Sequence, residues 1–271
     1  MISLYGGTGF IGKSFCNLFS DEIIKIDRDS REPKSNEILY FISTTTNYNV
    51  FEDLHIDINT NLNLLMEVLK YCKNENIIFN FISSGFVYGL DIINAKESDI
   101  PDPKGFYSIT KRSAEQLLIS FCETFGCKYR IFRLGNVYGT DKTVSPKKNV
   151  LGFLINKLKN NEEIQLYDKG KVLRDYMHVD DVNRAIMHII KYGSINQIYN
   201  VATGQPRLFC DIIGMAHAEL KSKSKITYIE TPIFYRSTQA KNFSLNIEKL
   251  SQLNFSPKIP LELGIKELCI N

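Results

Sequence analysis

The 271-residue sequence lacks the features that would place the protein at a membrane, on a nucleic acid or around a metal ion. No apolar run is long enough to span a bilayer, and Met1 leads straight into a strand-like segment, which leaves no room for a signal peptide. The formal net charge of +3 is too small to indicate a nucleic-acid or membrane partner. The six cysteines contain no C-x-x-C pair and no histidine at zinc spacing, so we expect reduced thiols and no metal site. These absences favour a cytoplasmic protein.

A glycine-rich turn follows the first predicted strand. Ile2-Ser3-Leu4-Tyr5 runs into Gly6-Gly7-Thr8-Gly9-Phe10-Ile11-Gly12, and a helical pattern follows over residues 13–19. The first glycine permits a tight turn, the second lets backbone N–H groups approach a pyrophosphate, and the third lets the helix press against its strand. The positive end of the helix dipole faces the same pyrophosphate. We therefore assign a dinucleotide site to Gly6, Gly9, Phe10, Ile11 and Gly12.

Asp27 closes the next predicted strand, residues 23–27, where the adenosine ribose of a dinucleotide would lie. Its carboxylate would accept hydrogen bonds from the ribose hydroxyls and would repel a 2′-phosphate, which favours NAD over NADP. Arg28, which we also assign to the cofactor site, and Arg31 keep NADPH open as an alternative.

Short apolar runs alternate with helical patterns through the first two thirds of the chain. This alternation predicts an α/β fold, a doubly wound Rossmann sheet with a small C-terminal α/β lobe. We expect an NAD-binding domain over residues 1–140 and a mainly substrate-binding lobe over residues 141–271, interleaved with the last sheet strands. The further predicted strands are 39–43, 77–83, 129–133, 198–201 and 226–229; the further helices are 59–72, 107–125, 151–158, 182–191, 209–220 and 247–253.

Tyr107 and Lys111 form a second motif, one that indicates a catalytic site. On a helix, side chains four residues apart share a face, so the phenol and the ammonium can reach one site. A nearby lysine cation lowers the pKa of a phenol and makes it a usable base near neutral pH. The preceding strand ends near Ser84, at the sheet edge where open α/β sheets bind ligands. Ser84 can therefore hydrogen-bond the same substrate oxygen as Tyr107.

Together these motifs resemble the extended short-chain dehydrogenases/reductases, and among them the NAD-dependent epimerases and dehydratases of nucleotide sugars. The resemblance covers nearly the whole chain. Besides the glycine-rich turn and the Tyr107–Lys111 pair, it rests on the segments Ser83-Ser84-Gly85-Phe86-Val87-Tyr88-Gly89, Arg133-Leu134-Gly135-Asn136-Val137-Tyr138-Gly139, Arg174-Asp175-Tyr176-Met177-His178-Val179-Asp180-Asp181 and Tyr199-Asn200-Val201.

The resemblance implies NAD as cofactor, a nucleotide-diphosphate sugar as substrate, and a catalytic triad of Ser84, Tyr107 and Lys111. Residues that match Asn136, Arg174 and Arg236 approach the diphosphate in the family, and an arginine fork suits phosphate oxygens. His178 lies in a segment that resembles a family loop in which the histidine is structural.

The resemblance also implies a homodimer, in which the helices at 59–72 and 107–125 pair across a twofold axis. Five apolar residues fit either that interface or the intramolecular core: Leu65, Val68, Leu117, Leu118 and Phe121.

The chain departs from the family beside the adenosine. Only about ten residues separate Asp27 from the strand at 39–43, and they cannot hold the helix and strand that the family normally has there. We therefore expect this pair to be missing, the strand carrying Asp27 to be the sheet edge, and the adenine side to be more open. Ser43 stands in a segment where the family often has histidine and alanines, so we expect its hydroxyl to contact the cofactor.

Gly85 and Phe86 form a second departure. The family 4,6-dehydratases place an aspartate and a glutamate at these positions, and neither glycine nor phenylalanine can transfer a proton. Our leading hypothesis is therefore a nucleotide-sugar 4-epimerase that oxidises the sugar transiently to a keto intermediate. The alternatives are an NAD(P)H-dependent 4-keto-sugar-nucleotide reductase, in which Tyr107 donates the proton, and a non-catalytic nucleotide-binding protein.

Overall fold

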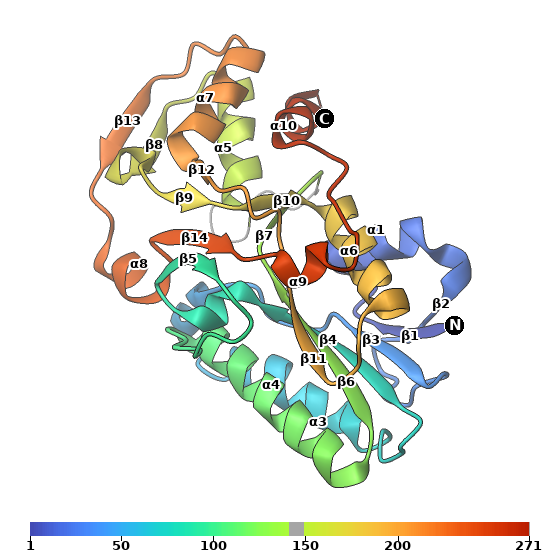
Figure 1. The fold of residues 1–271 in the computed structure, drawn as a ribbon. Helices are drawn as coiled ribbons and strands as arrows, with labels where there is room; N and C mark the ends of the chain where they lie inside the picture. The colour runs from blue at the N-terminus through green and yellow to red at the C-terminus, as the bar shows by residue number, and fades with distance from the viewer. Residues whose placement is uncertain (141–148, 271) are drawn as a thin grey trace.

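The computed structural model describes residues 1–140 and 149–270, and its centre is a parallel β-sheet (Figure 1). Six strands pair in the order β11-β6-β4-β3-β1-β2, and every neighbouring pair is parallel. The strands are β1 (Ile2–Tyr5), β2 (Ile23–Lys25), β3 (Glu37–Tyr40), β4 (Ile78–Ser84), β6 (Lys128–Leu134) and β11 (Gln197–Val201). The predicted α/β class and parallel sheet are confirmed.

Helices cover both faces of this sheet. On one face lie α1 (Phe10–Leu18) and α6 (Val179–Tyr192), whose apolar residues Phe15, Val182 and Ile186 enter the core at helical spacing. On the other face α3 (Leu64–Leu69) and α4 (Phe106–Phe125) run alongside each other (Figure 1). Strands that are covered on both sides in this way need apolar residues on both faces, which explains their continuous apolar runs.

The segment between β3 and β4 differs from the single helix predicted over residues 59–72. The chain forms a short α2 (Ile56–Ile58), a π-helical turn (Asn59–Asn63) and then α3. The wide turn carries the buried Asn61, whose amide accepts from the N–H of Thr44 and donates to the hydroxyl of Thr110 on α4. The spacing of apolar residues over 59–72 did not indicate that a buried asparagine would interrupt this helix.

β2 is the edge of the sheet, and residues 26–36 contain neither helix nor strand. The predicted loss of a helix–strand pair at this edge is therefore confirmed. Asp27 does not close the strand, however, because β2 ends at Lys25.

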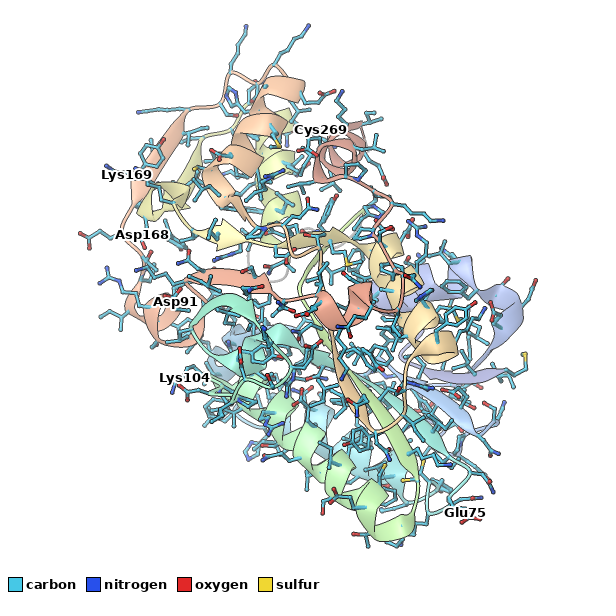
Figure 2. The ribbon with its side chains drawn as sticks, viewed as in Figure 1. Glu75, Asp91, Lys104, Asp168, Lys169 and Cys269 are labelled. Carbon is cyan, nitrogen blue, oxygen red and sulfur yellow. The ribbon has the colours of Figure 1, made fainter. Side chains whose placement is uncertain are left out.

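A second group of elements forms the C-terminal lobe. Its core lies between α5 (Val150–Lys159), α7 (Phe209–Glu219) and α10 (Leu261–Ile270), beside the parallel pair of β8 (Ile164–Tyr167) and β13 (Ile226–Ile229). In Figure 2, Glu75 beyond the sheet and Cys269 in this lobe mark opposite ends of the molecule. The predicted boundary after residue 140 adjoins residues 141–148, which lie outside the described ranges. Within those ranges no helix is long and apolar enough to cross a membrane.

Short elements join the lobe to the sheet. Three two-stranded pairs connect them: β7 (Asn136–Tyr138) with β10 (Tyr176–His178), β9 (Leu173–Arg174) with β12 (Arg207–Leu208), and β5 (Asp91–Ala95) with β14 (Asn242–Leu245). The short helices are η1 (Ser20–Glu22), η2 (Asn47–Phe51), η4 (Gly85–Tyr88), η5 (Asp168–Gly170), α8 (Ile233–Thr238) and α9 (Glu248–Ser251).

A buried ion pair fixes α4 against the sheet. Glu115 on α4 is 0% exposed, and its carboxylate accepts two hydrogen bonds from Arg133 on β6, at 3.0 and 2.8 Å. It also accepts one from Ser83 on β4 at 2.5 Å and one from Arg112 at 2.9 Å. A buried charge is tolerated only when its partners satisfy it in this way.

We expect Glu115→Gln to lower the free energy of unfolding by about 3–5 kcal/mol, because the buried guanidinium of Arg133 loses its counter-charge. Urea denaturation measures this loss. Glu123→Gln, an exposed change on the same helix, is the control and should change stability by less than about 0.5 kcal/mol. Equal effects of the two changes would contradict the structural role of the ion pair.

Candidate functional site

The glycine-rich turn leaves the first turn of α1 open to a ligand. Gly9 is the N-cap of α1, no side chain caps the helix, and its first turn contains no acidic residue. Gly6 has φ +79°, a conformation that favours glycine. A Cβ at Gly12 would lie 2.3 Å from the carbonyl oxygen of Gly6, whereas a Cβ at Gly9 would meet that oxygen only at 3.6 Å. Gly12 is thus required by packing, and Gly9 leaves the backbone accessible to a pyrophosphate.

The residues predicted to hold the adenosine ribose lie beyond the end of β2. Asp27 and Arg28 are both exposed. The guanidinium of Arg31 donates to the carbonyl oxygens of Arg28 at 2.6 Å and Ser30 at 3.0 Å, which closes the loop after the strand. The ribose side is therefore open, as expected from the missing helix and strand.

Ser43 follows β3 and its hydroxyl turns into the protein. It donates to the carbonyl of Thr44 at 2.7 Å and is bonded to the amide oxygen of Asn61 at 3.1 Å. The hydroxyl is thus engaged with two partners inside the protein, and its contact with the cofactor stays a prediction.

Ser84, Tyr107 and Lys111 come together at the carboxyl end of β4. Ser84 is the last residue of that strand, and its side chain lies near enough to the phenol of Tyr107, in the first turn of α4, to lower the pKa of that phenol. The Ser84 hydroxyl oxygen accepts a hydrogen bond from the backbone N–H of Phe86 at 3.2 Å. The Lys111 ammonium, 1% exposed, donates to the carbonyl of Ile82 at 2.5 Å and lies 4.2 Å from the ring centre of Phe81. The helical spacing of Tyr107 and Lys111 therefore places both beside one strand end.

The ionisation of these groups differs from the sequence prediction. Burial raises the pKa of the Tyr107 phenol; the neighbouring Ser84 hydroxyl opposes this rise, and the nearby carboxylate of Asp57 adds to it. Burial lowers the pKa of Lys111 to about 7, against the attraction of Glu115. The expected lowering of the phenol pKa is thus outweighed by desolvation in this structure.

Sequence reasoning missed a buried polar layer next to Tyr107. Asp57 is buried and accepts hydrogen bonds from Thr44 and, at 3.1 Å, from Asn49. Asn47 accepts a hydrogen bond from the backbone N–H of Tyr107 at 3.0 Å. Asparagine, aspartate and threonine crowded over residues 44–61 were the available signal, but the bonds that Asn47 and Asn61 make to α4 join residues far apart in the sequence.

The predicted diphosphate residues lie on three elements near the joint between sheet and lobe. Asn136 is on β7, and its buried amide oxygen has no hydrogen-bond partner among the described residues. Arg174 on β9 donates to the carbonyl oxygens of Ala240 at 3.1 Å and Lys241 at 2.8 Å. Arg236 on α8 is exposed and bonds the carbonyl of Thr231 at 2.8 Å. The structure therefore brings Arg174 close to the segment that follows α8, and leaves the guanidinium of Arg236 on the surface.

His178 is placed as a structural residue. Its ring nitrogen accepts from the N–H of Asp180 at 3.2 Å and so caps α6. This agrees with the structural interpretation of its segment.

The two residues after Ser84, Gly85 and Phe86, pack against β14. A Cβ at Gly85 would lie 2.6 Å from the ring of Phe243 and about 3.0 Å from Leu245, both on β14. The Phe86 ring lies 4.9 Å from that of Phe243, in a small apolar cluster. No acid or base occupies either position.

The comparisons with known proteins agree with this fold and site. The profile of the NAD dependent epimerase/dehydratase family matches residues 49–202. The chain is 32% identical over 149 residues to dTDP-D-glucose 4,6-dehydratase of Dictyostelium discoideum. That alignment covers 50% of this chain and 34% of the Dictyostelium protein. The chain is 27% identical to dTDP-4-dehydro-6-deoxyglucose reductase of Escherichia coli over 72% of this chain and 60% of that protein. The chain thus spans about a third to three fifths of the length of these two curated relatives.

Among solved structures, UDP-glucose 4-epimerase of Thermotoga maritima with UDP-glucose has a TM-score of 0.88 at 21% identity, over 99% of this chain and 97% of that one. This likeness shows the fold. The chain has an α/β, Rossmann-type fold, and it belongs to the NAD dependent epimerase/dehydratase family. The family is NAD dependent, and the uncapped turn at Gly9 fits the pyrophosphate of such a dinucleotide.

We expect Gly9→Ala to reduce NAD affinity at least tenfold with little change in melting temperature, because the added methyl group occupies the ligand side of the turn. Gly12→Ala should instead lower the melting temperature, since its Cβ collides with the backbone of Gly6. Calorimetric titration with NAD and thermal unfolding separate the two effects. Unchanged NAD affinity in Gly9→Ala would contradict the placement of the cofactor.

Proposed function

We propose that the protein is a nucleotide-sugar 4-epimerase that acts by transient oxidation of the sugar at C4. The observation that carries this proposal is the placement of Ser84 beside Tyr107 at the end of β4, with no second acid or base at residues 85 and 86. Epimerisation needs one proton acceptor and a hydride carrier. The site provides the first, and NAD supplies the hydride acceptor and donor when it is bound.

In this proposal each residue has a separate task. Tyr107, as phenolate, takes the proton from the sugar 4-hydroxyl and later returns it. Ser84 donates a hydrogen bond to the same oxygen and fixes its distance from the phenol. Lys111, in its protonated form, would support the phenolate with its positive charge and would bond the nicotinamide ribose. A positioned base commonly contributes about 10²–10⁴-fold to rate, and exclusion of water by the closed site strengthens each of these polar contacts.

The packing around Gly85 argues against dehydration. Loss of water from the sugar needs an additional acid and base, but any side chain at residue 85 would collide with Phe243. The Phe86 ring packs against Phe243 and cannot exchange a proton. Several dehydratases are similar to this chain in sequence, but their chemistry requires groups that these two positions do not carry.

A reductase of 4-keto-sugar nucleotides is the second candidate. The raised pKa of Tyr107 favours it, because a protonated phenol is the donor that a reductase needs. The Escherichia coli relative, which matches more of this chain than the Dictyostelium protein does, is a reductase of this kind. The open ribose side next to Arg28 also leaves space for the 2′-phosphate of NADPH.

The substrate is proposed to be a nucleotide-diphosphate sugar. The arrangement of Asn136, Arg174 and Arg236 near the joint between sheet and lobe supports this class, with Arg236 turning inwards when a diphosphate is present. In the same scheme the NAD-binding region is the sheet with its helices, and the elements after residue 149 that do not join the sheet bind the sugar nucleotide.

We expect the purified wild-type protein to interconvert C4 epimers of UDP-glucose, UDP-N-acetylglucosamine or dTDP-glucose without added reductant. Tyr107→Phe should lose about 10²–10⁴-fold in turnover and still bind NAD, because it lacks only the hydroxyl that exchanges the proton. Chromatography of the sugar nucleotides measures turnover, and the nucleotide released on denaturation identifies the cofactor.

Retained activity in Tyr107→Phe would overturn the role of the phenol. A protein that epimerises none of these sugars, and that oxidises NADPH when a 4-keto-sugar nucleotide is added, would be the reductase instead. Bound NAD without turnover of either kind would support the non-catalytic alternative.

We also propose a homodimer, through only part of the expected set of residues. Leu65, Val68 and Leu118 are fully buried in the intramolecular core and cannot contribute. Leu117 on α4 is exposed, as are the apolar residues Ile58 on α2 and Phe106, Ile109 and Phe125 on α4. Leu117→Glu should convert a dimer to a monomer in light scattering, whereas Ile100→Glu, on a distant exposed loop, should not. A monomeric wild type would refute the proposal.

A further inference from the structure

α4, the helix that carries Tyr107, has no N-terminal cap of its own. Its N-cap residue is Gly105, with φ +79°, and it offers no side chain to the first turn. The cap comes instead from Asn47 in η2, 60 residues earlier, whose amide oxygen accepts from the N–H of Tyr107 at 3.0 Å. A Cβ at residue 105 would lie 2.5 Å from that oxygen. The glycine is therefore required so that a remote amide can cap this helix.

The other end of the same amide reaches the C-terminal segment. The Nδ2 group of Asn47 donates to the carbonyl of Thr238, the last residue of α8, at 2.9 Å across 191 residues of sequence. Asn47 is 4% exposed, so neither of its hydrogen bonds is exchanged freely with water. One buried side chain thus links the residue proposed as proton acceptor to the helix that carries Arg236.

α8 is held on this side by aromatic packing as well. The ring of Phe234 lies 5.2 Å from that of Tyr48 and 4.7 Å from that of Phe51, both in η2. The rings of Tyr48 and Tyr235 lie 5.7 Å apart, edge to face. Aromatic pairs of this kind stabilise the packing beyond simple burial, so η2 and α8 are held together.

On its other side the segment after α8 is held by Arg174. The guanidinium donates to two successive carbonyl oxygens, those of Ala240 and Lys241. A phosphate group competes well for an arginine fork, and its arrival would change these bonds. The segment 233–241 therefore has one set of contacts to a proposed diphosphate residue and another to the cap of α4.

We propose that Asn47 is a positioning residue that couples occupation of the nucleotide-sugar site to the alignment of Tyr107. The proposal rests on the proposed function, because it takes a nucleoside diphosphate as the ligand that engages Arg174 and α8. When that ligand fixes α8, the amide of Asn47 holds the first turn of α4, and the phenol stays at hydrogen-bond distance from the sugar. Without the link the first turn frays, and a small misplacement of the reacting groups costs much of the rate.

The test uses hydrogen–deuterium exchange with UDP and dTDP as probes. In the wild type, the nucleotide should slow exchange in residues 233–241 and also in residues 106–110. Asn47→Asp keeps an acceptor for the N–H of Tyr107 but has no donor for Thr238; Asn47→Ala removes both bonds. In both variants we expect the slowing at 233–241 to remain and the slowing at 106–110 to disappear. Asn63→Ala, at an exposed asparagine, is the control and should behave as the wild type.

The kinetic readout separates positioning from binding. With an accepted sugar nucleotide, Asn47→Ala should lower kcat at least tenfold while KM changes by less than threefold. Slowing at 106–110 that persists in both Asn47 variants, or that is absent from a wild type whose residues 233–241 are slowed, would overturn the coupling. If neither nucleotide slows exchange at 233–241 in the wild type, the proposed nucleotide-sugar function fails, and the coupling fails with it.

Discussion

The structure depends on one buried carboxylate. Glu115 is fully enclosed, and it is satisfied only because Ser83 on β4 and Arg133 on β6 reach it from two strands. These bonds set the rotation and height of α4 on the sheet. Lys111 lies one turn before Glu115 and Tyr107 one turn before that, so the same bonds direct both towards the end of β4. Ser83 and Ser84 are adjacent on that strand and have different partners. Ser83 hydrogen-bonds the Glu115 carboxylate on the helix, and Ser84 lies beside the Tyr107 phenol.

Much of this arrangement follows from local sequence. The glycine-rich turn and the i, i+4 spacing of Tyr107 and Lys111 are local features, and a parallel sheet needs only apolar runs separated by helices. Counting the residues after Asp27 was enough to predict the lost helix and strand. What the sequence could not show depends on contacts between distant residues: the cap that Asn47 gives α4, the π-turn at Asn61, and the burial that raises the phenol pKa. Leu65 and Leu118 illustrate the same limit, because periodicity does not distinguish an internal core from an interface.

Packing, as well as polar chemistry, restricts what the site can do. Gly85 has no side chain because β14, from the far end of the chain, lies against it. The C-terminal segment thus fills the space beside residue 85, where a second acid would have to stand. This segment continues from α8, so in the proposed function one stretch of chain bears on both the substrate contacts and the reaction class.

The edge position of β2 has a consequence for the purine ring of the cofactor. Among the described residues no strand lies beyond β2, and the loop that follows it is exposed at Asp27 and Arg28. We therefore expect the base of a bound dinucleotide to meet solvent over much of its surface, with the affinity concentrated in the diphosphate at the start of α1. On this expectation, dinucleotides with hypoxanthine or a modified adenine should replace NAD at little cost.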